Sequence, residues 1–184
     1  LSVVGFVNPN SQENFSLVNC GPKWHDIPVY KNFPNIPNTP NFPNSVGIYF
    51  NAKHVLYWVQ EIIKYPSIKN VVIFAEDVPE KDAREIVALA KKHKVNIIGP
   101  SSTGMIVPGK GRLGEIGGDW LNLNLCRLNQ PGPVGIVTKS GTMSGEMLWV
   151  VSQNSPGVAQ AVHIGGDAFP ATDFVYWLEE FSKS

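Results

Sequence analysis

The fold class is decided by residues 46–99, which read VGIYFNAKHVLYWVQEIIKYPSIKNVVIFAEDVPEKDAREIVALAKKHKVNIIG. Apolar runs short enough for buried strands alternate here with segments long enough for helices. The predicted strands are Val46–Phe50, Val71–Ala75 and Val95–Gly99, and the predicted helices are Ala52–Lys64 and Pro79–His93. This alternation is typical of βαβ units, which require a parallel sheet with right-handed crossovers. The sequence therefore predicts an α/β protein.

The same alternation returns after residue 133. The expected strands are Val134–Thr138 and Val158–Ile164, and the expected helices are Gly141–Gln153 and Ala171–Phe181. Residues 100–133 interrupt the rhythm with many glycines and prolines, so we expect a domain junction that ends near residue 130. Two strands are too few to close a core, so the segment from 131 to 184 is expected to be only part of a second domain.

The N-terminal segment is less regular. Val3–Val7 has the β-branched density of a strand and stops at the turn Asn8-Pro9-Asn10. Residues 31–45 carry Asn or Pro at nearly every second place, which favours an extended surface loop over a proline-rich partner ligand. Because the chain opens directly on a strand-like run, we expect it to be a piece of a longer protein.

Composition excludes several function classes. The 184 residues contain 15 basic and 15 acidic side chains, so the broad positive charge of a nucleic-acid binder is missing. Two distant cysteines predict no metal cluster and fit a reducing, cytoplasmic compartment. No apolar run approaches the length of a membrane span. We expect neither nucleic acid nor membrane as a partner.

Ser140, Gly141 and Thr142 form a turn between a predicted strand and a predicted helix. The free amides at a helix start, with Lys139 beside them, suit a phosphate or carboxylate. The alternative is that Ser140 or Thr142 only caps the helix. A second such turn, Gly165-Gly166-Asp167, follows the next strand, and parallel strands place these ends along one edge.

Glu76 directly follows a predicted buried strand and is the candidate general base or ligand-binding carboxylate. Asp77 and Glu80 are interpreted as complements to the following helix dipole. Residues 109–114 match the dinucleotide pattern G-x-G-x-x-G, but they follow no clear strand and open no clear helix, so we reject that interpretation. His163 lies inside an apolar strand and is interpreted as a half-buried structural residue.

Five ordered motifs resemble the superfamily of the succinyl-CoA synthetase α subunit and ATP-citrate lyase. They are AEDVPE (75–80), VNIIGP (95–100), PG (108–109), PGPVGIVTKSGT (131–142) and IGGD (164–167). MSGE (143–146), PSSTG (100–104) and IPVYKN (27–32) are more similar to ATP-citrate lyase than to the succinate enzymes.

The resemblance implies a Rossmann-like CoA-binding domain over residues 1–130, without its first strand and loop, and part of a flavodoxin-like ligase domain over 131–184. It implies a citrate–CoA ligase that uses ATP and Mg²⁺ through a phosphohistidine, with a β-type ATP-grasp partner in an oligomer. Ser140, Gly141, Thr142 and the 165–167 turn would hold the phosphoryl group, and Glu76 would act as base. The residues expected to border CoA are Asn8, Pro9, Phe50, Asn51, Ser102 and Thr103.

The chain also departs from the family pattern. The family histidine sits in Gly-His-Ala-Gly-Ala, and none of the four histidines here is followed by Ala-Gly. We therefore expect the chain to be inactive alone, with the phosphorylated residue beyond Ser184. Two alternatives stay open: succinate or another small acid as substrate, and a non-catalytic module that senses acyl-CoA.

Overall fold

The computed structural model describes residue 3 and residues 5–19, 24–37 and 42–183. The chain divides into two compact units, Leu1–Asn44 and Ser45–Ser184, each of which is described by itself. No described helix is both long and apolar enough to cross a lipid bilayer.

The first unit is built on a three-stranded sheet with the order β1-β3-β2. β1 (Phe6–Val7) runs parallel to β3 (Trp24–Tyr30), and β2 (Phe15–Asn19) pairs antiparallel with β3. A short 3₁₀ helix, η1 (Phe33–Asn35), follows, with Asn32 as its N-cap. Proline fits the first turn of such a helix because the missing amide has no helical partner there.

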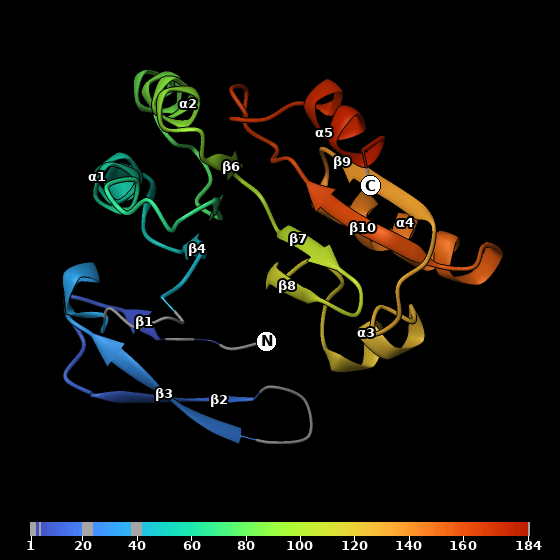
Figure 1. The fold of residues 1–184 in the computed structure, drawn as a ribbon, viewed down its shortest axis with the longest axis horizontal. Coiled ribbons are helices and arrows are strands. Elements are labelled where there is room, and N and C mark those ends of the chain that lie inside the picture. Colours follow the sequence, from blue (N-terminus) through green and yellow to red (C-terminus); the bar gives the residue numbers. More distant parts are fainter. Residues whose placement is uncertain (1–2, 4, 20–23, 38–41, 184) are drawn as a thin grey trace. The chain divides into compact units, whose positions relative to one another are not determined.

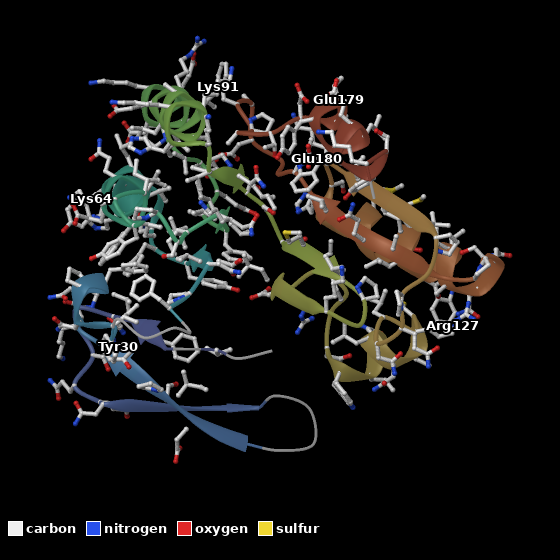
Figure 2. The ribbon with its side chains drawn as sticks, in the orientation of Figure 1. Tyr30, Lys64, Lys91, Arg127, Glu179 and Glu180 are labelled. Carbon is white, nitrogen blue, oxygen red and sulfur yellow. The ribbon has the colours of Figure 1, made fainter. Side chains whose placement is uncertain are left out.

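The second unit begins with a parallel sheet of β4 (Ser45–Ile48), β5 (Asn70–Ile73) and β6 (Asn96–Ile98) (Figure 1). α1 (Ala52–Ile62) and α2 (Glu80–His93) connect these strands. Acidic residues occupy the first turn of α2 and basic residues its last turn, which complements the helix dipole. Figure 2 shows Lys91, in the last turn of α2, projecting away from the ribbon.

The second sheet of this unit has the order β8-β7-β10-β9 (Figure 1). β9 (Val134–Thr138) and β10 (Val158–His163) are parallel, whereas β7 (Gly104–Val107) pairs antiparallel with both β10 and β8 (Gly111–Gly114). α3 (Trp120–Leu125), α4 (Gly141–Asn154) and α5 (Phe174–Phe181) complete the unit. Gly99 donates its amide to the Ile164 carbonyl at 3.1 Å and so joins the two sheets.

Strands β5 and β6 of the parallel sheet are buried because their side chains are apolar. Val71, Val72 and Ile73 of β5 are fully buried, as are Ile97 and Ile98 of β6. A continuous apolar run of this kind is typical of a parallel strand covered on both faces. Burying each such side chain stabilises the fold by roughly 1.5–3 kcal/mol. The carboxyl ends of β5 and β6 are therefore fixed by their core packing.

The predicted α/β class and the strand and helix order after residue 45 are confirmed. Three predictions were incomplete. Residues 31–45 are not only an extended surface loop, because η1 lies there with Phe33 and Ile36 buried; residues 38–41 fall outside the described ones. Residues 100–133 contain the β7–β8 hairpin and α3 rather than a plain junction. α5 begins at Phe174, three residues after the predicted start.

Contrary to the sequence-based expectation, the G-x-G-x-x-G stretch does follow a strand, β7. It then forms a hairpin turn at Gly109 and β8 and opens no helix, as expected, so it lacks the helix start of a dinucleotide fingerprint. The four-stranded sheet combines strands from both sides of residue 130, because β9 and β10 gain β7 and β8 as partners. The domain boundary near residue 130 stays a prediction.

Candidate functional site

The ends of several strands of the second unit enclose a cavity of about 510 Å³. It lies where β4, β5, β6, β9 and β10 give way to loops, the position at which open α/β sheets bind ligands. Its lining residues are Tyr49, Phe74, Glu76, Ser101, Ser102, Thr103, Glu115, Lys139, Ser140, Gly141, His163 and Gly166.

The start of α4 supplies unpaired backbone donors to this cavity. Ser140 caps the helix: its carbonyl accepts from the Ser144 amide at 3.0 Å, and its hydroxyl lies 3.5 Å from the Met143 amide. Within residues 42–183, the amides of Ser140, Gly141 and Thr142 have no protein acceptor. Both predicted roles of the turn are thus geometrically compatible, because the cap uses the Ser140 side chain and leaves these amides open.

Ser144 anchors the beginning of α4 to the end of β9. Its buried hydroxyl donates to the Ser140 carbonyl at 3.0 Å and also contacts the Thr138 hydroxyl. Because both hydroxyls are buried and satisfied, the first turn of α4 has a fixed direction relative to the strand. A helix start held in this way presents its amides without further reorganisation.

His163, the last residue of β10, bridges two of the loops that line the cavity. The residue is only 3% exposed. Its Nδ1 accepts from the Thr103 amide at 2.7 Å, and its Nε2 lies 3.1 Å from the Lys139 carbonyl. Since an amide can only donate and a carbonyl can only accept, the ring is neutral with its proton on Nε2. Burial lowers the pKa of His163, although the Lys139 carbonyl partly opposes that shift.

Thr103 is also fixed from its other side. Its carbonyl accepts from the amides of Glu115 and Ile116, each at 2.8 Å. The neighbouring Ser102 hydroxyl donates to the His163 carbonyl at 2.6 Å and accepts from the Gly104 amide at 2.8 Å. The loop after β6 is therefore tied both to β8 and to β10, which makes this wall of the cavity rigid.

The 165–167 turn packs directly against the loop after β6. Gly165 has a φ of +107°, and a Cβ there would lie 2.0 Å from the Pro100 carbonyl oxygen. Only glycine accepts both the left-handed backbone and the close approach. The Gly166 amide donates to the Ser101 carbonyl at 3.1 Å, so this amide is not free for a ligand.

The cavity combines one cationic and two acidic side chains. Lys139 follows β9, whereas Glu76 follows β5 and Glu115 follows β8; all three are exposed. Tyr49 stacks on Phe74 with ring centroids 3.9 Å apart. Desolvation and the Glu115 carboxylate raise the pKa of Tyr49, and Arg112 partly offsets this. The acidic side chains outnumber the cationic one, so the side chains together do not attract an anion. An anion in this cavity would therefore have to be held by the backbone amides and Lys139.

The structure brings together six of the predicted site residues on this cavity: Glu76, Ser102, Thr103, Ser140, Gly141 and Gly166. Thr142 and Gly165 lie next to lining residues. Asp167 lines a separate hollow of about 220 Å³ and accepts from the Val78 amide at 3.4 Å. Their roles in binding or catalysis stay predictions.

The remaining predicted CoA residues have local structural roles. Asn51 caps α1 by accepting from the Lys53 amide at 3.3 Å, and Phe50 stacks on Trp58 at 4.7 Å. Asn8 and Pro9 belong to the first unit, where the Asn8 amide donates to the Tyr30 carbonyl at 2.9 Å. Among the described residues, no group of three or more His, Cys, Asp or Glu is placed to hold a metal ion.

Sequence reasoning missed the cavity roles of His163, Tyr49 and Glu115. His163 was interpreted as merely structural, but it ends a strand directly before the 164–167 motif, and this position was a usable signal. Glu115 reaches the cavity only through the β7–β8 hairpin, which sequence periodicity did not predict.

Comparison with solved structures identifies the class of enzyme to which this fold is similar. No family model matches the chain. The structure matches "ATP citrate lyase from Methanothrix soehngenii in complex with citrate and coenzyme A" with a TM-score of 0.92, at 28% identity, over 98% of this chain and 29% of that one. A second match is a Methanosaeta concilii ATP citrate lyase mutant in complex with (3S)-citryl-CoA, with a TM-score of 0.91 and 28% identity. The fold is therefore that of a segment of a CoA-ligase-type enzyme.

The sequence comparison is more specific. The chain is 37% identical over 174 residues to the Neurospora crassa protein named "Probable ATP-citrate synthase subunit 1", covering 95% of this chain and 26% of that protein. It is 35% identical over 171 residues to the Arabidopsis thaliana ATP-citrate synthase beta chain protein 2, covering 28% of it. The chain is homologous to one segment of the ATP-citrate synthases, as the motifs predicted, and spans about a quarter of the length of these curated relatives.

Proposed function

We propose that this chain provides the CoA-binding and phosphate-binding parts of an ATP-dependent citrate–CoA ligase. The observation that carries the proposal is the set of open amides at Ser140, Gly141 and Thr142 beside a 510 Å³ cavity. Relatives of this sequence are ATP-citrate synthases, and the matched solved structures contain citrate, coenzyme A or citryl-CoA. Citrate and CoA are therefore the substrates that the proposal assigns.

In the proposed reaction, a phosphoryl group passes from ATP to a histidine outside this chain and then to a citrate carboxylate. The CoA thiol then loses its proton, its sulfur bonds to the citryl carbon, and the bond from that carbon to the phosphate oxygen breaks. Inorganic phosphate leaves and citryl-CoA remains. ATP and Mg²⁺ are held mainly by a β-type ATP-grasp subunit or domain.

This chain's own residues contribute binding and orientation. The amides of Gly141 and Thr142 and the Lys139 ammonium hold the oxygens of the phosphoryl group as negative charge shifts onto it. Glu76 accepts the thiol proton from its place at the end of β5. Asn8, Pro9, Phe50, Asn51, Ser102 and Thr103 are the residues assigned to CoA, and the Gly165–Asp167 turn is assigned to the phosphoryl or citrate group.

Binding measurements on the 184-residue chain test this function. Isothermal titration should show that CoA and inorganic phosphate each bind and that either can bind in the presence of the other. Lys139→Met removes the ammonium but keeps the backbone of the turn, and it should weaken phosphate binding while CoA affinity is unchanged. Failure of CoA to bind would overturn the proposal.

The second candidate function is a non-catalytic sensor of acyl-CoA, which the absence of a Gly-His-Ala-Gly-Ala segment from the sequence favours. A sensor needs the CoA contacts but has no use for open amides aimed at a phosphoryl group. Binding of CoA and acyl-CoA without any binding of inorganic phosphate would favour the sensor over the ligase.

A further inference from the structure

We propose that His163 is a positioning residue of the anion site. Its neutral ring joins the loop at Thr103 to the turn at Lys139 and so holds the amides at the start of α4 toward the cavity. This inference rests on the proposed function, because it assumes that the cavity receives a phosphoryl group or a similar anion. His163 itself does not contact the anion in this account.

The contacts of the ring define a brace between two loops. Nδ1 accepts from the Thr103 amide at 2.7 Å, and Nε2 donates to the Lys139 carbonyl at 3.1 Å. Lys139 directly precedes Ser140, the N-cap of α4. Thr103 is held on its far side by the amides of Glu115 and Ile116. The brace therefore connects a rigid loop to the residue from which α4 begins.

The ring also lies against the first residue of α4. A Cβ built on Gly141 would lie 3.8 Å from His163 Cε1 and 3.3 Å from Thr103 Cγ2. The ring and Thr103 are therefore near neighbours of the first residue of α4. We expect a displaced ring to change the position of the Gly141 amide as well as that of the loop.

Both ring nitrogens are occupied by backbone groups, and the side chain is almost fully buried. His163 therefore has no free nitrogen lone pair with which to accept a phosphoryl group. This separates the inference from a role for His163 as the phosphorylated residue.

Protonation should release the brace. It would add a second N–H to the ring, at Nδ1, which then faces the Thr103 amide donor at 2.7 Å and keeps only its 3.0 Å contact with the Thr103 hydroxyl. The charged or titratable side chains that face the same cavity are Lys139 after β9, Glu76 after β5, Glu115 after β8 and Tyr49 after β4. Burial lowers the pKa of His163 from its ordinary 6.5, so the release is expected only below that pH.

The direction of this pH effect is diagnostic. A positive charge beside an anion site would ordinarily strengthen anion binding through Coulomb attraction. The brace predicts the opposite, because protonation moves the amides of α4 away from their binding geometry. Inorganic sulfate is the suitable probe because its charge stays constant through this pH range.

The experiment measures sulfate affinity of the full 184-residue chain by isothermal titration across mildly acidic to neutral pH. His163→Leu removes both contacts and should weaken binding about tenfold at neutral pH. His163→Asn places Oδ1 where Nδ1 stood and so keeps an acceptor for the Thr103 amide without a titrating group. Because it lacks the donor to the Lys139 carbonyl, its sulfate affinity should lie between those of the wild type and His163→Leu, with no acidic loss.

His93→Gln is the matched control, because His93 is an exposed histidine on the last turn of α2. It should keep both the affinity and the pH dependence of the wild type. The ¹⁵N shifts of His163 in the wild type give a reading that needs no variant. They should report the Nε2-protonated tautomer at neutral pH.

The outcomes distinguish failure of the positioning role of His163 from failure of the anion site itself. Wild-type binding that is unchanged in His163→Leu, or that strengthens as pH falls, overturns the positioning role and leaves the anion site intact. An Nδ1-protonated tautomer also overturns it. Failure of the wild type to bind sulfate removes the anion site, and both the proposed function and this inference fail with it.

Discussion

Replacing Gly141 with proline should remove one anion donor without disturbing the helix that carries it. Gly141 is the first residue of α4, where proline is favoured because the amide has no helical partner. Ser140 has φ −116° and ψ 131°, which is the extended conformation that a residue before proline adopts. The local backbone therefore already suits Gly141→Pro, and the variant should fold.

The expected loss follows from the hydrogen bond that disappears. A hydrogen bond to a charged group contributes about 1.5–3 kcal/mol, which corresponds to roughly ten- to hundredfold in affinity. The thermal stability of the chain should stay the same or rise, because proline restricts the unfolded state.

Isothermal titration of inorganic phosphate into the purified chain checks this, with two controls on the same helix. Gly141→Ala adds the Cβ but keeps the amide, so it isolates the steric contact of 3.3 Å with Thr103 Cγ2. Gly145→Ala adds a Cβ that meets nothing within 4 Å and should leave phosphate affinity unchanged. Equal phosphate affinity of Gly141→Pro and Gly141→Ala would refute the assignment of the amide as a donor.

Three further predictions concern the framework of the site. Gly165→Ala should lower the free energy of unfolding by about 2 kcal/mol, measured by urea denaturation, because φ is +107° and the Cβ would lie 2.0 Å from the Pro100 carbonyl oxygen; an unchanged midpoint would contradict this. Tyr176→Phe should cost about 1 kcal/mol by losing the bond from its hydroxyl to Asn96 Oδ1; a neutral effect in the same assay would show that water replaces that bond. Because burial lowers the pKa of His163 below 6.5, the unfolded chain binds more protons than the folded one in mild acid; stability should therefore fall as pH drops below 6.5 and level off below the folded pKa, and His163→Asn should lack this loss.

Much of the second unit was predictable from local sequence. Strands such as Val134–Thr138 and helices such as Gly141–Gln153 carry strong periodicity, and the structure has both within one residue. The β7–β8 hairpin was missed because Gly104, Gly109, Gly111 and Gly114 give it few side chains to form an alternating pattern. The hairpin is held in place by the pairing of β7 with β10, which lies about fifty residues later in the chain.

The candidate site was predictable only in part for the same reason. Glu76, Ser140 and Gly141 lie within three residues of the ends of β5 and β9, so their position at one edge of the fold follows from parallel topology. His163 reaches Thr103 and Lys139 across sixty and twenty-four residues of chain, and no spacing rule indicates such contacts. Tertiary hydrogen bonds of this kind have to be seen in the structure.

The central claim is that the amides at the start of α4 bind anionic oxygens. Its most direct test is a titration of the ¹⁵N-labelled chain with inorganic phosphate, followed through backbone amide resonances. The account predicts saturable shifts centred on Ser140, Gly141 and Thr142, with Gly145 unaffected. Saturable binding that leaves these three amides unmoved, or no binding at all, would contradict it.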